Sequence, residues 1–365
     1  MQHRNKISWF NEFEIYDLEV INGVITLNSI CLNGVCRVNY VIFAPDFKPL
    51  KVMWNDIRNK ENVLFLNEPF IIPRFGLLQI LSKKCPIISL LVKKSSFLYK
   101  YLLKPISFRL EDECIFIYMN PWNMFMAETG LLDYLKNKFP KSLHVIIFGD
   151  VRVAKNSDLN FLKKNYNFLF IYDKVEAERL NIDYIPPFYS KNFATPKIEE
   201  EKYDITFVGH AKNRLKQIIE LYEIAKKKGY ICKFYIVGAQ AEDRKYPDEI
   251  IYSDKLIDEQ TYFNEYIRKT KCLLELTLVG TEALTARVRE AIVYDKKLLT
   301  NNAGIVKYPF YNDKMIKIFT NINEIDFHFL KEPKYSYNYN NEFSPIHFLN
   351  KIETKYWETI GGLQR

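Results

Sequence analysis

Residues 204–238 read DITFVGHAKNRLKQIIELYEIAKKKGYICKFYIVG, and this stretch decides the fold class. Two apolar runs, DITFVG at 204–209 and KFYIVG at 233–238, flank a helical pattern from Arg214 to Lys228. Short continuous apolar runs suit strands that are buried on both faces, as the strands of a parallel sheet are. The stretch therefore predicts a strand–helix–strand unit of a Rossmann-like α/β domain.

Further apolar runs extend this pattern in both directions. Downstream, we expect helices around Glu259–Lys269 and Thr285–Tyr294, and strands at 273–276 and 297–301. Upstream, a helical segment lies at 130–139, and the runs expected to be strands are 51–55, 62–67, 114–119, 144–149 and 168–173. The sequence predicts an α/β fold with two Rossmann-like domains facing a cleft, where the carboxyl ends of both sheets would bind ligands.

A change in composition separates the two domains. Residues 184–190, YIPPFYS, are rich in proline, and three glutamates follow at 199–201, which is typical of a linker. We expect an N-terminal domain at 1–190 and a C-terminal domain at 191–343. The tail, 344–365, is predicted to be a helix that packs back on the N-terminal domain.

The first strands of the chain have hairpin signals between them. Residues 14–21, 24–32 and 35–43 are separated by Asn22-Gly23 and Asn33-Gly34. Asn-Gly favours two-residue turns because both central positions need a positive φ. Residues 14–43 are therefore predicted to form a small β-meander before the main domain.

The composition excludes several classes of protein. An apolar fraction of 48% in 365 residues is ordinary for a globular protein, so intrinsic disorder is not expected. Every long tract carries charged or polar groups, so no transmembrane helix is expected. The six cysteines have no C-x-x-C spacing, which argues against a zinc site. With no apolar stretch at the start of the chain, we expect a cytoplasmic location.

The excess of basic residues is concentrated in one segment. The net charge is +8, and residues 70–110 alone contain eight basic residues and no acidic one. Polybasic segments with apolar faces bind anionic membrane surfaces, so this window is a candidate for contact with the inner face of the cell membrane. The alternative is a pair of solvated helices with a buried apolar face.

The first candidate site is FVGHAKNR at 207–214, where a strand ends and a helix begins. A helix start offers unpaired N–H groups and a positive dipole end, which suit a phosphate. Gly209 would let the backbone approach a ligand closely, and Lys212 and Arg214 would add positive charge. The alternative is an ordinary strand–helix turn with solvated basic side chains.

The second candidate site is GTEALTARVRE at 280–290, which follows a predicted strand and opens a helix. Thr285 is a suitable N-cap, Arg287 could pair with a pyrophosphate, and Glu290 could accept both hydroxyls of a ribose. Glu282 and Glu290 also form a Glu-x7-Glu spacing. The alternative is an amphipathic helix with an i,i+3 ion pair between Arg287 and Glu290.

These motifs resemble a known family. The run ALTARVREAIVYDKKLLTNNAGIVKYPFYNDKMIKIF at 283–319 looks like the C-terminal signature of bacterial surface-polysaccharide and lipopolysaccharide glycosyltransferases of the GT-B fold. Residues 207–214 are similar to the first turn of that family's C-terminal domain, and residues 167–190 to its interdomain crossing. The likeness is strongest after residue 204. The family usually has glycine where Ala283 stands, which is a departure from its pattern.

The resemblance implies transfer of a sugar from a nucleotide-diphosphate donor to a glycan acceptor, often a lipid-linked one. The N-terminal domain would then bind the acceptor and the C-terminal domain the donor. By matching motif, Lys212, Arg214, Thr285 and Arg287 would lie at the donor's phosphates, and Glu290 at its ribose. No cofactor beyond the donor substrate is implied.

A metal-independent mechanism is expected. The sequence has no Asp-x-Asp that could hold a divalent cation against a diphosphate. Arginine, lysine and helix dipoles would then stabilise the leaving group. An inverting reaction would also need a base in the N-terminal domain. Asp150 is the first candidate and Glu68 the second, although each carboxylate could equally cap a helix or form a salt bridge.

Two other functions fit parts of the sequence. A nucleotide-sugar epimerase on the same two-domain frame would need no lipid acceptor, so it would leave the basic window at 70–110 without a role. A nucleic-acid-binding protein could use that window. However, no RNP-type motif, zinc finger or helix-turn-helix signature is present, so no nucleic-acid partner is expected.

Overall fold

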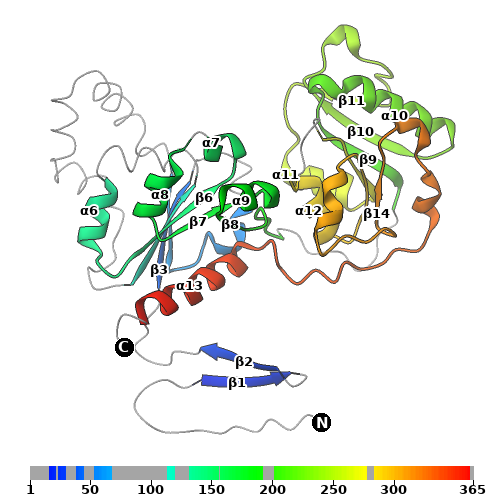
Figure 1. Cartoon of the computed structure of the whole chain (residues 1–365). Coiled ribbons are helices and arrows are strands. Elements are labelled where there is room, and N and C mark those ends of the chain that lie inside the picture. Colours follow the sequence, from blue (N-terminus) through cyan, green and yellow to red (C-terminus); the bar gives the residue numbers. More distant parts are fainter. Residues whose placement is uncertain are drawn as a thin grey trace, which may run out of the picture.

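In the part of the chain that the structure describes, two six-stranded parallel sheets and one separate hairpin make up the fold (Figure 1). The structure is a computed structural model that describes residues 16–21, 24–29, 38–44, 53–67, 113–119, 131–155, 157–191, 201–277 and 283–361. The prediction of an α/β fold with two Rossmann-like domains is confirmed. Among the described residues, no helix has both the length and the hydrophobicity needed to cross a bilayer.

The C-terminal sheet has the strand order of a Rossmann fold. Its strands pair in parallel in the order β11-β10-β9-β12-β13-β14. They are β9 (Tyr203–His210), β10 (Cys232–Val237), β11 (Ile251–Ser253), β12 (Thr270–Glu275), β13 (Lys297–Thr300) and β14 (Ile316–Ile318). Counted from β9, the order is 3-2-1-4-5-6, which reverses between β9 and β12. Ligands of open α/β sheets bind outside the carboxyl ends of the strands at such a switch point.

Helices cover the C-terminal sheet. The main ones are α10 (Leu215–Lys227), α11 (Glu259–Tyr262), which continues into the π-helical turn η4 (Phe263–Ile267), and α12 (Ala286–Val293). The shorter 3-10 segments are η2 (Lys212–Arg214), η3 (Ala241–Asp243), η5 (Ala303–Lys307), η6 (Ile322–Glu324) and η7 (Phe327–Lys331).

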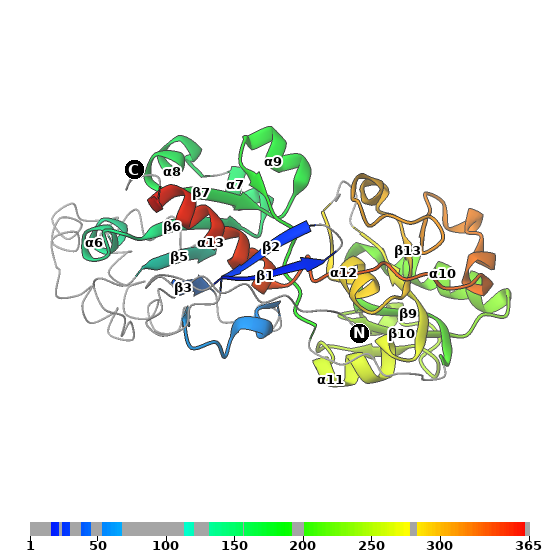
Figure 2. The same cartoon turned by 90° about the horizontal axis from the view of Figure 1, so that it is seen from below.

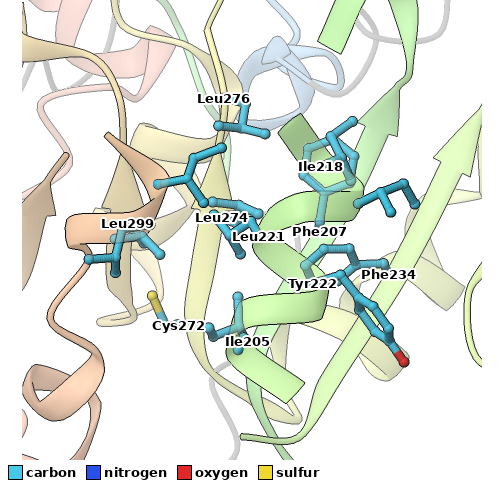
Figure 3. Packing of buried hydrophobic residues seen from close by; sticks show 14 of the residues in the cluster. Ile205, Phe207, Ile218, Leu221, Tyr222, Phe234, Cys272, Leu274, Leu276 and Leu299 are labelled. Atoms are coloured by element: carbon cyan, nitrogen blue, oxygen red, sulfur yellow. The ribbon is translucent and has the colours of Figure 1, made fainter. Parts of the chain in front are cut away.

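Helix α10 packs on strands β9 and β10 through a regular row of apolar side chains. Ile218, Leu221 and Tyr222 recur at helical spacing and are at most 3% exposed. They pack on Phe207 of β9 and Phe234 of β10 (Figure 3). Burying a side chain of this size contributes about 1.5–3 kcal/mol, so this face fixes the helix on the sheet.

The N-terminal sheet is also wholly parallel, in the order β4-β3-β5-β6-β7-β8. Its strands are β3 (Asn39–Ala44), β4 (Val63–Asn67), β5 (Cys114–Met119), β6 (Leu143–Phe148), β7 (Phe168–Ile171) and β8 (Asp183–Tyr184). The helical segments described here are η1 (Asn55–Ile57), α6 (Leu131–Lys138), α7 (Val151–Lys155), α8 (Leu159–Asn165) and α9 (Lys174–Leu180).

The last helix, α13 (Pro345–Gly361), lies against the N-terminal sheet although it follows the C-terminal domain (Figures 1 and 2). Phe348, Leu349, Ile352 and Tyr356 are buried in one cluster with residues of β3, β5 and β6. The Tyr356 hydroxyl also donates to the Lys141 carbonyl at 2.7 Å. The chain thus crosses between the domains twice.

The predicted β-meander over residues 14–43 is wrong in its third strand. β1 (Tyr16–Ile21) and β2 (Val24–Ser29) pair antiparallel, with Ile21 opposite Val24. The next strand, β3, lies inside the N-terminal sheet and pairs in parallel with β4 and β5. Its apolar run from Val41 to Ala44 is almost fully buried, which suits a strand covered on both faces.

The prediction of a strand at 51–55 is also wrong over residues 53–55, which the structure describes. Asn55–Ile57 form the 3-10 helix η1, and Trp54 and Ile57 are both buried on one side of it. This i,i+3 spacing suits a helical turn, whereas a strand would direct the two side chains to opposite faces. An apolar run of this length does not distinguish the two.

Candidate functional site

The two sequence motifs meet at the switch point of the C-terminal sheet. The first follows the end of β9, and the second opens α12, which comes after β12. Arg287 of the second motif donates from Nη2 to the Val208 carbonyl of the first, at 2.8 Å. Arg214 of the first motif donates to the Leu276 carbonyl, one residue beyond β12. The site is therefore built by side chains that reach across from one strand end to the other.

Gly209 is the second-last residue of β9 and packs against an aromatic ring. A Cβ added at this position would lie 3.1 Å from Cζ of Phe207, which is tighter than an ordinary contact. Phe207 is itself buried in the core under α10. Glycine here lets the backbone lie close to that ring, so a larger residue would push the ring or the strand end aside.

Arg214 is a partly buried cation with unused hydrogen-bonding capacity. Besides its bond to Leu276, it donates from Nη2 to the His210 carbonyl at 2.8 Å. Its Nε is buried and has no partner among the described residues. Burial lowers the pKa of its guanidinium, because removal from water disfavours the charge. An anion beside it would offset that cost.

Thr285 caps α12, as its sequence predicts. Its Oγ1 accepts from the backbone N–H of Arg287 at 3.2 Å, and its hydroxyl donates to a carboxylate oxygen of Glu275. The other oxygen of that carboxylate accepts from the Thr300 hydroxyl. Glu275 thereby connects the ends of β12 and β13 to the first turn of α12.

Glu275 is a candidate that the sequence analysis missed. It is 2% exposed, and burial raises the pKa of its carboxyl group. The sequence does contain a sign of this residue's role, because Glu275 is the one charged residue in the apolar run LLEL at 273–276. A carboxyl group in a buried strand needs partners from elsewhere, and those partners are not visible in the sequence.

Arg287 and Glu290 form a buried ion pair, which is the alternative that the sequence left open. Glu290 Oε2 accepts from Arg287 Nη1 and from the Tyr262 hydroxyl, the latter at 2.7 Å. The side chains of Arg287 and Glu290 are 20% and 7% exposed. Burial alone would lower the pKa of Arg287, but Glu290 and Tyr262 raise it overall. Its positive charge is therefore retained.

Tyr262 is the second residue that the sequence analysis missed. Its hydroxyl accepts from Arg287 Nη1, and the Arg287 guanidinium carbon lies 4.6 Å from the centre of its ring. Tyr262 immediately precedes the π-helical turn η4, and such turns are frequent at functional sites. It is 25 residues away from Arg287 in the sequence, so no local pattern connects the two.

The charges of this site favour an anion. Arg214 and Arg287 lie in it. Arg289 of α12 lies beside it and donates to the Thr285 and Phe188 carbonyls. They face two carboxylates, Glu275 and Glu290, and burial shifts Glu275 towards its neutral form. Among the described residues of the site, three cations against two acids leave a net positive charge of one, or of two when Glu275 is protonated.

Of the other predicted site residues, Lys212 lines a different cavity. Lys212 is exposed, has a φ of 44°, and lines a separate open cavity of about 480 Å³ together with residues of α10. A positive φ is uncommon for a residue other than glycine, and such positions cluster at functional loops. Glu282, Glu68 and the basic window 70–110 lie outside the described residues.

Asp150 lies at the carboxyl end of β6 and holds the start of α7. Its Oδ1 accepts from the backbone N–H of Arg152 at 2.8 Å, and its Oδ2 pairs with the Arg152 guanidinium at 2.8 Å. Arg152 lowers the pKa of this carboxyl, which weakens it as a base. Its role as a catalytic base stays a prediction.

No protein-family model matches the chain, and no curated protein matches it in sequence. Among solved structures it is similar to the catalytic domain of starch synthase IV from Arabidopsis thaliana bound to ADP and acarbose. That likeness has a TM-score of 0.45 and 8% identity, and covers 72% of this chain and 75% of that one.

Two further solved structures are similar over comparable lengths. The spinosyn rhamnosyltransferase SpnG has a TM-score of 0.37 and 12% identity, covering 72% of this chain and 80% of its own. SsfS6, a glycosyltransferase of Streptomyces sp. SF2575, has a TM-score of 0.34 and 10% identity, covering 72% and 81%. All three TM-scores are below 0.5.

Proposed function

We propose that this chain is a metal-independent glycosyltransferase that takes a sugar from a nucleotide-diphosphate donor. The observation that carries the proposal is the hydrogen bond from Arg287 to Val208. It joins two residues that are 79 positions apart and that belong to motifs which each resemble a donor-binding element of GT-B glycosyltransferases. Their meeting point is also where a Rossmann sheet of this strand order binds its ligand.

The donor's diphosphate would lie at the start of α12, between Arg214 and Arg287. The free N–H groups of the first helical turn and the two guanidinium groups would stabilise the charge that develops on the leaving group. Arg214 Nε is buried and has no partner among the described residues, so a nearby anion would offset the cost of burying this guanidinium. A preorganised positive site of this kind supplies electrostatic catalysis without a metal ion.

Glu290 would accept the hydroxyls of the donor's ribose. In the structure it already accepts from Tyr262 and Arg287, so the ribose would have to share or replace these donors. Such an exchange keeps the buried carboxylate paired throughout, which avoids the cost of leaving it without a partner.

The acceptor is proposed to be a glycan or a lipid-linked saccharide of cell-surface polysaccharide or lipopolysaccharide synthesis. This part rests on the family resemblance and on the eight basic residues at 70–110. A cytoplasmic enzyme that touches anionic lipid through these residues should sediment with anionic vesicles at low salt. It should be released as the salt concentration rises, because salt screens the attraction.

The donor site is tested by screening nucleotide sugars for thermal stabilisation of the protein. A ligand at 100 times its Kd stabilises the folded state by about 2.7 kcal/mol. The combined substitution Arg287→Gln and Glu290→Gln should remove this effect without leaving one charge buried alone. The matched control is Glu176→Gln with Arg179→Gln, another i,i+3 pair, on α9. If nucleotide sugars stabilise both double variants equally, the donor does not bind at Arg287 and Glu290.

A further inference from the structure

A second cavity, of about 250 Å³, lies where the two domains and the segment before α13 meet. None of its lining residues belongs to the candidate donor site. Aromatic rings from three separate stretches of the chain line it, namely Tyr184, Tyr308, Phe310, Tyr337, Tyr339 and Phe343. Glu342 is the one charged side chain among the described residues that line it.

Five of these rings form a continuous wall. Their centres are 6.3 Å apart for Tyr184 and Tyr308, and 5.4 Å for Tyr308 and Phe310, which are stacked. Phe343 then meets Phe310 edge-on at 6.0 Å and stacks on Tyr339 at 5.5 Å. The face of an aromatic ring carries partial negative charge, so such a wall attracts a cation.

Three polar atoms of this cavity are engaged within the chain. The Tyr337 hydroxyl donates to the Lys296 carbonyl at 3.3 Å, and the Tyr339 hydroxyl accepts from the Phe343 N–H at 3.3 Å. Glu342 Oε2 accepts from the Asn340 N–H at 3.0 Å. A sugar or a primary ammonium group needs several hydrogen-bond partners. A quaternary ammonium group needs none.

Carboxylates act on three of the tyrosines that line the cavity. Burial is the main reason why the pKa values of Tyr184, Tyr337 and Tyr339 are raised. The carboxylates of Asp173, Asp295 and Glu342 add to this effect at the three residues in turn. The opposing charge near Tyr184 is Arg289, whose guanidinium is bonded to the Phe188 carbonyl.

We propose that this cavity binds a quaternary ammonium group, which lies against the aromatic wall and is balanced by Glu342. Methylated ammonium presents apolar methyl groups that share its charge, and aromatic pockets recognise it through cation–π attraction. The volume is below the range of about 300–1,000 Å³ typical of drug-sized ligands, which suits a small head group. The inference is independent of the proposed glycosyl transfer.

The test uses choline and its neutral isostere 3,3-dimethylbutan-1-ol, titrated calorimetrically into the full-length protein. Choline should bind saturably, and the isostere at least about tenfold more weakly, because only the cation is attracted by the rings. Tyr339→Leu should weaken choline binding about tenfold, and Glu342→Gln should weaken it several-fold. Tyr335→Leu is the control, since Tyr335 is 42% exposed and does not line the cavity.

Phosphatidylcholine vesicles distinguish a lipid head group from a free solute as the source of the ligand, and binding of either supports the site. Equal binding of choline and the neutral isostere would contradict the proposal, as would no saturable choline binding. Glucosamine or glucose binding in place of choline would likewise overturn it. So would a loss of choline binding in Tyr335→Leu that matches the loss in Tyr339→Leu.

Discussion

At the scale of single residues, the ends of β9 and β12 bring buried charges into direct contact. Arg287, Glu290 and Tyr262 satisfy one another, and Glu275 relies on two threonine hydroxyls. Burying charged groups is costly unless they are paired and hydrogen-bonded. The charges of Arg287, Glu290 and Glu275 therefore combine a large electrostatic cost with pairing, which makes single substitutions at these positions informative.

The buried ion pair should be strongly coupled. Arg287→Gln leaves Glu290 buried without its cation and should destabilise the protein by about 3–5 kcal/mol. Adding Glu290→Gln should recover much of that loss. A double-mutant cycle by urea unfolding measures the coupling. The more exposed pair Arg179–Glu176 should show only about 0.2–1 kcal/mol. Equal coupling energies for the two pairs would contradict the buried pairing.

Glu275 should make stability depend on pH. Burial raises its folded-state pKa above the ordinary value of 4.5. Between these two pKa values the unfolded chain releases the proton while the folded chain keeps it, so stability falls as the pH rises and then levels off. Glu275→Gln lacks this proton and leaves one threonine hydroxyl mispaired. It should cost about 1–3 kcal/mol in acid.

The difference in the free energy of unfolding between the wild type and Glu275→Gln should therefore become smaller as the pH rises from about 4.5 towards neutrality. Urea unfolding of both proteins over this range measures it. Parallel stability curves would show that the Glu275 pKa is not raised. Thr277→Val, a change beside the same strand end that removes no ionisable group, is the control.

At the scale of elements, the sequence predicted most helices and strands because their apolar runs and caps are local features. The Thr285 cap and the helix behind it follow from a residue and its next neighbours. Glu275 and Tyr262 could not be assigned in this way, because their partners lie on other elements. The same limit explains β3, whose place depends on strands that come later in the chain.

Helix α13 should contribute directly to the stability of the N-terminal domain. Phe348 is 3% exposed and packs edge-on against Phe170 of β7 at 5.5 Å. Phe348→Ala should destabilise the domain by about 3–5 kcal/mol through lost burial and the cavity that remains. Trp357→Ala on the same helix is the control, because Trp357 is 39% exposed.

Urea unfolding of the two α13 variants, followed by the fluorescence of Trp54 in the same cluster, measures both effects. A cost below about 1 kcal/mol for Phe348→Ala would mean that the packing of α13 on the sheet is weak.

At the scale of the whole molecule, two Rossmann-like sheets are joined by two crossings that lie side by side (Figures 1 and 2). The Tyr189 N–H of the first crossing donates to the Phe343 carbonyl of the second at 2.8 Å. Arg289 ties α12 to the first crossing through the Phe188 carbonyl. Helix α12, whose first turn belongs to the candidate donor site, is thus also hydrogen-bonded to the first crossing between the domains.

The most direct measurement is a crystal structure of the protein in complex with UDP or GDP. We expect a diphosphate at the first turn of α12, within hydrogen-bonding distance of the Arg214 and Arg287 guanidinium groups, with no divalent cation bridging it. A nucleotide bound at another part of the molecule, or a diphosphate held through magnesium, would contradict it.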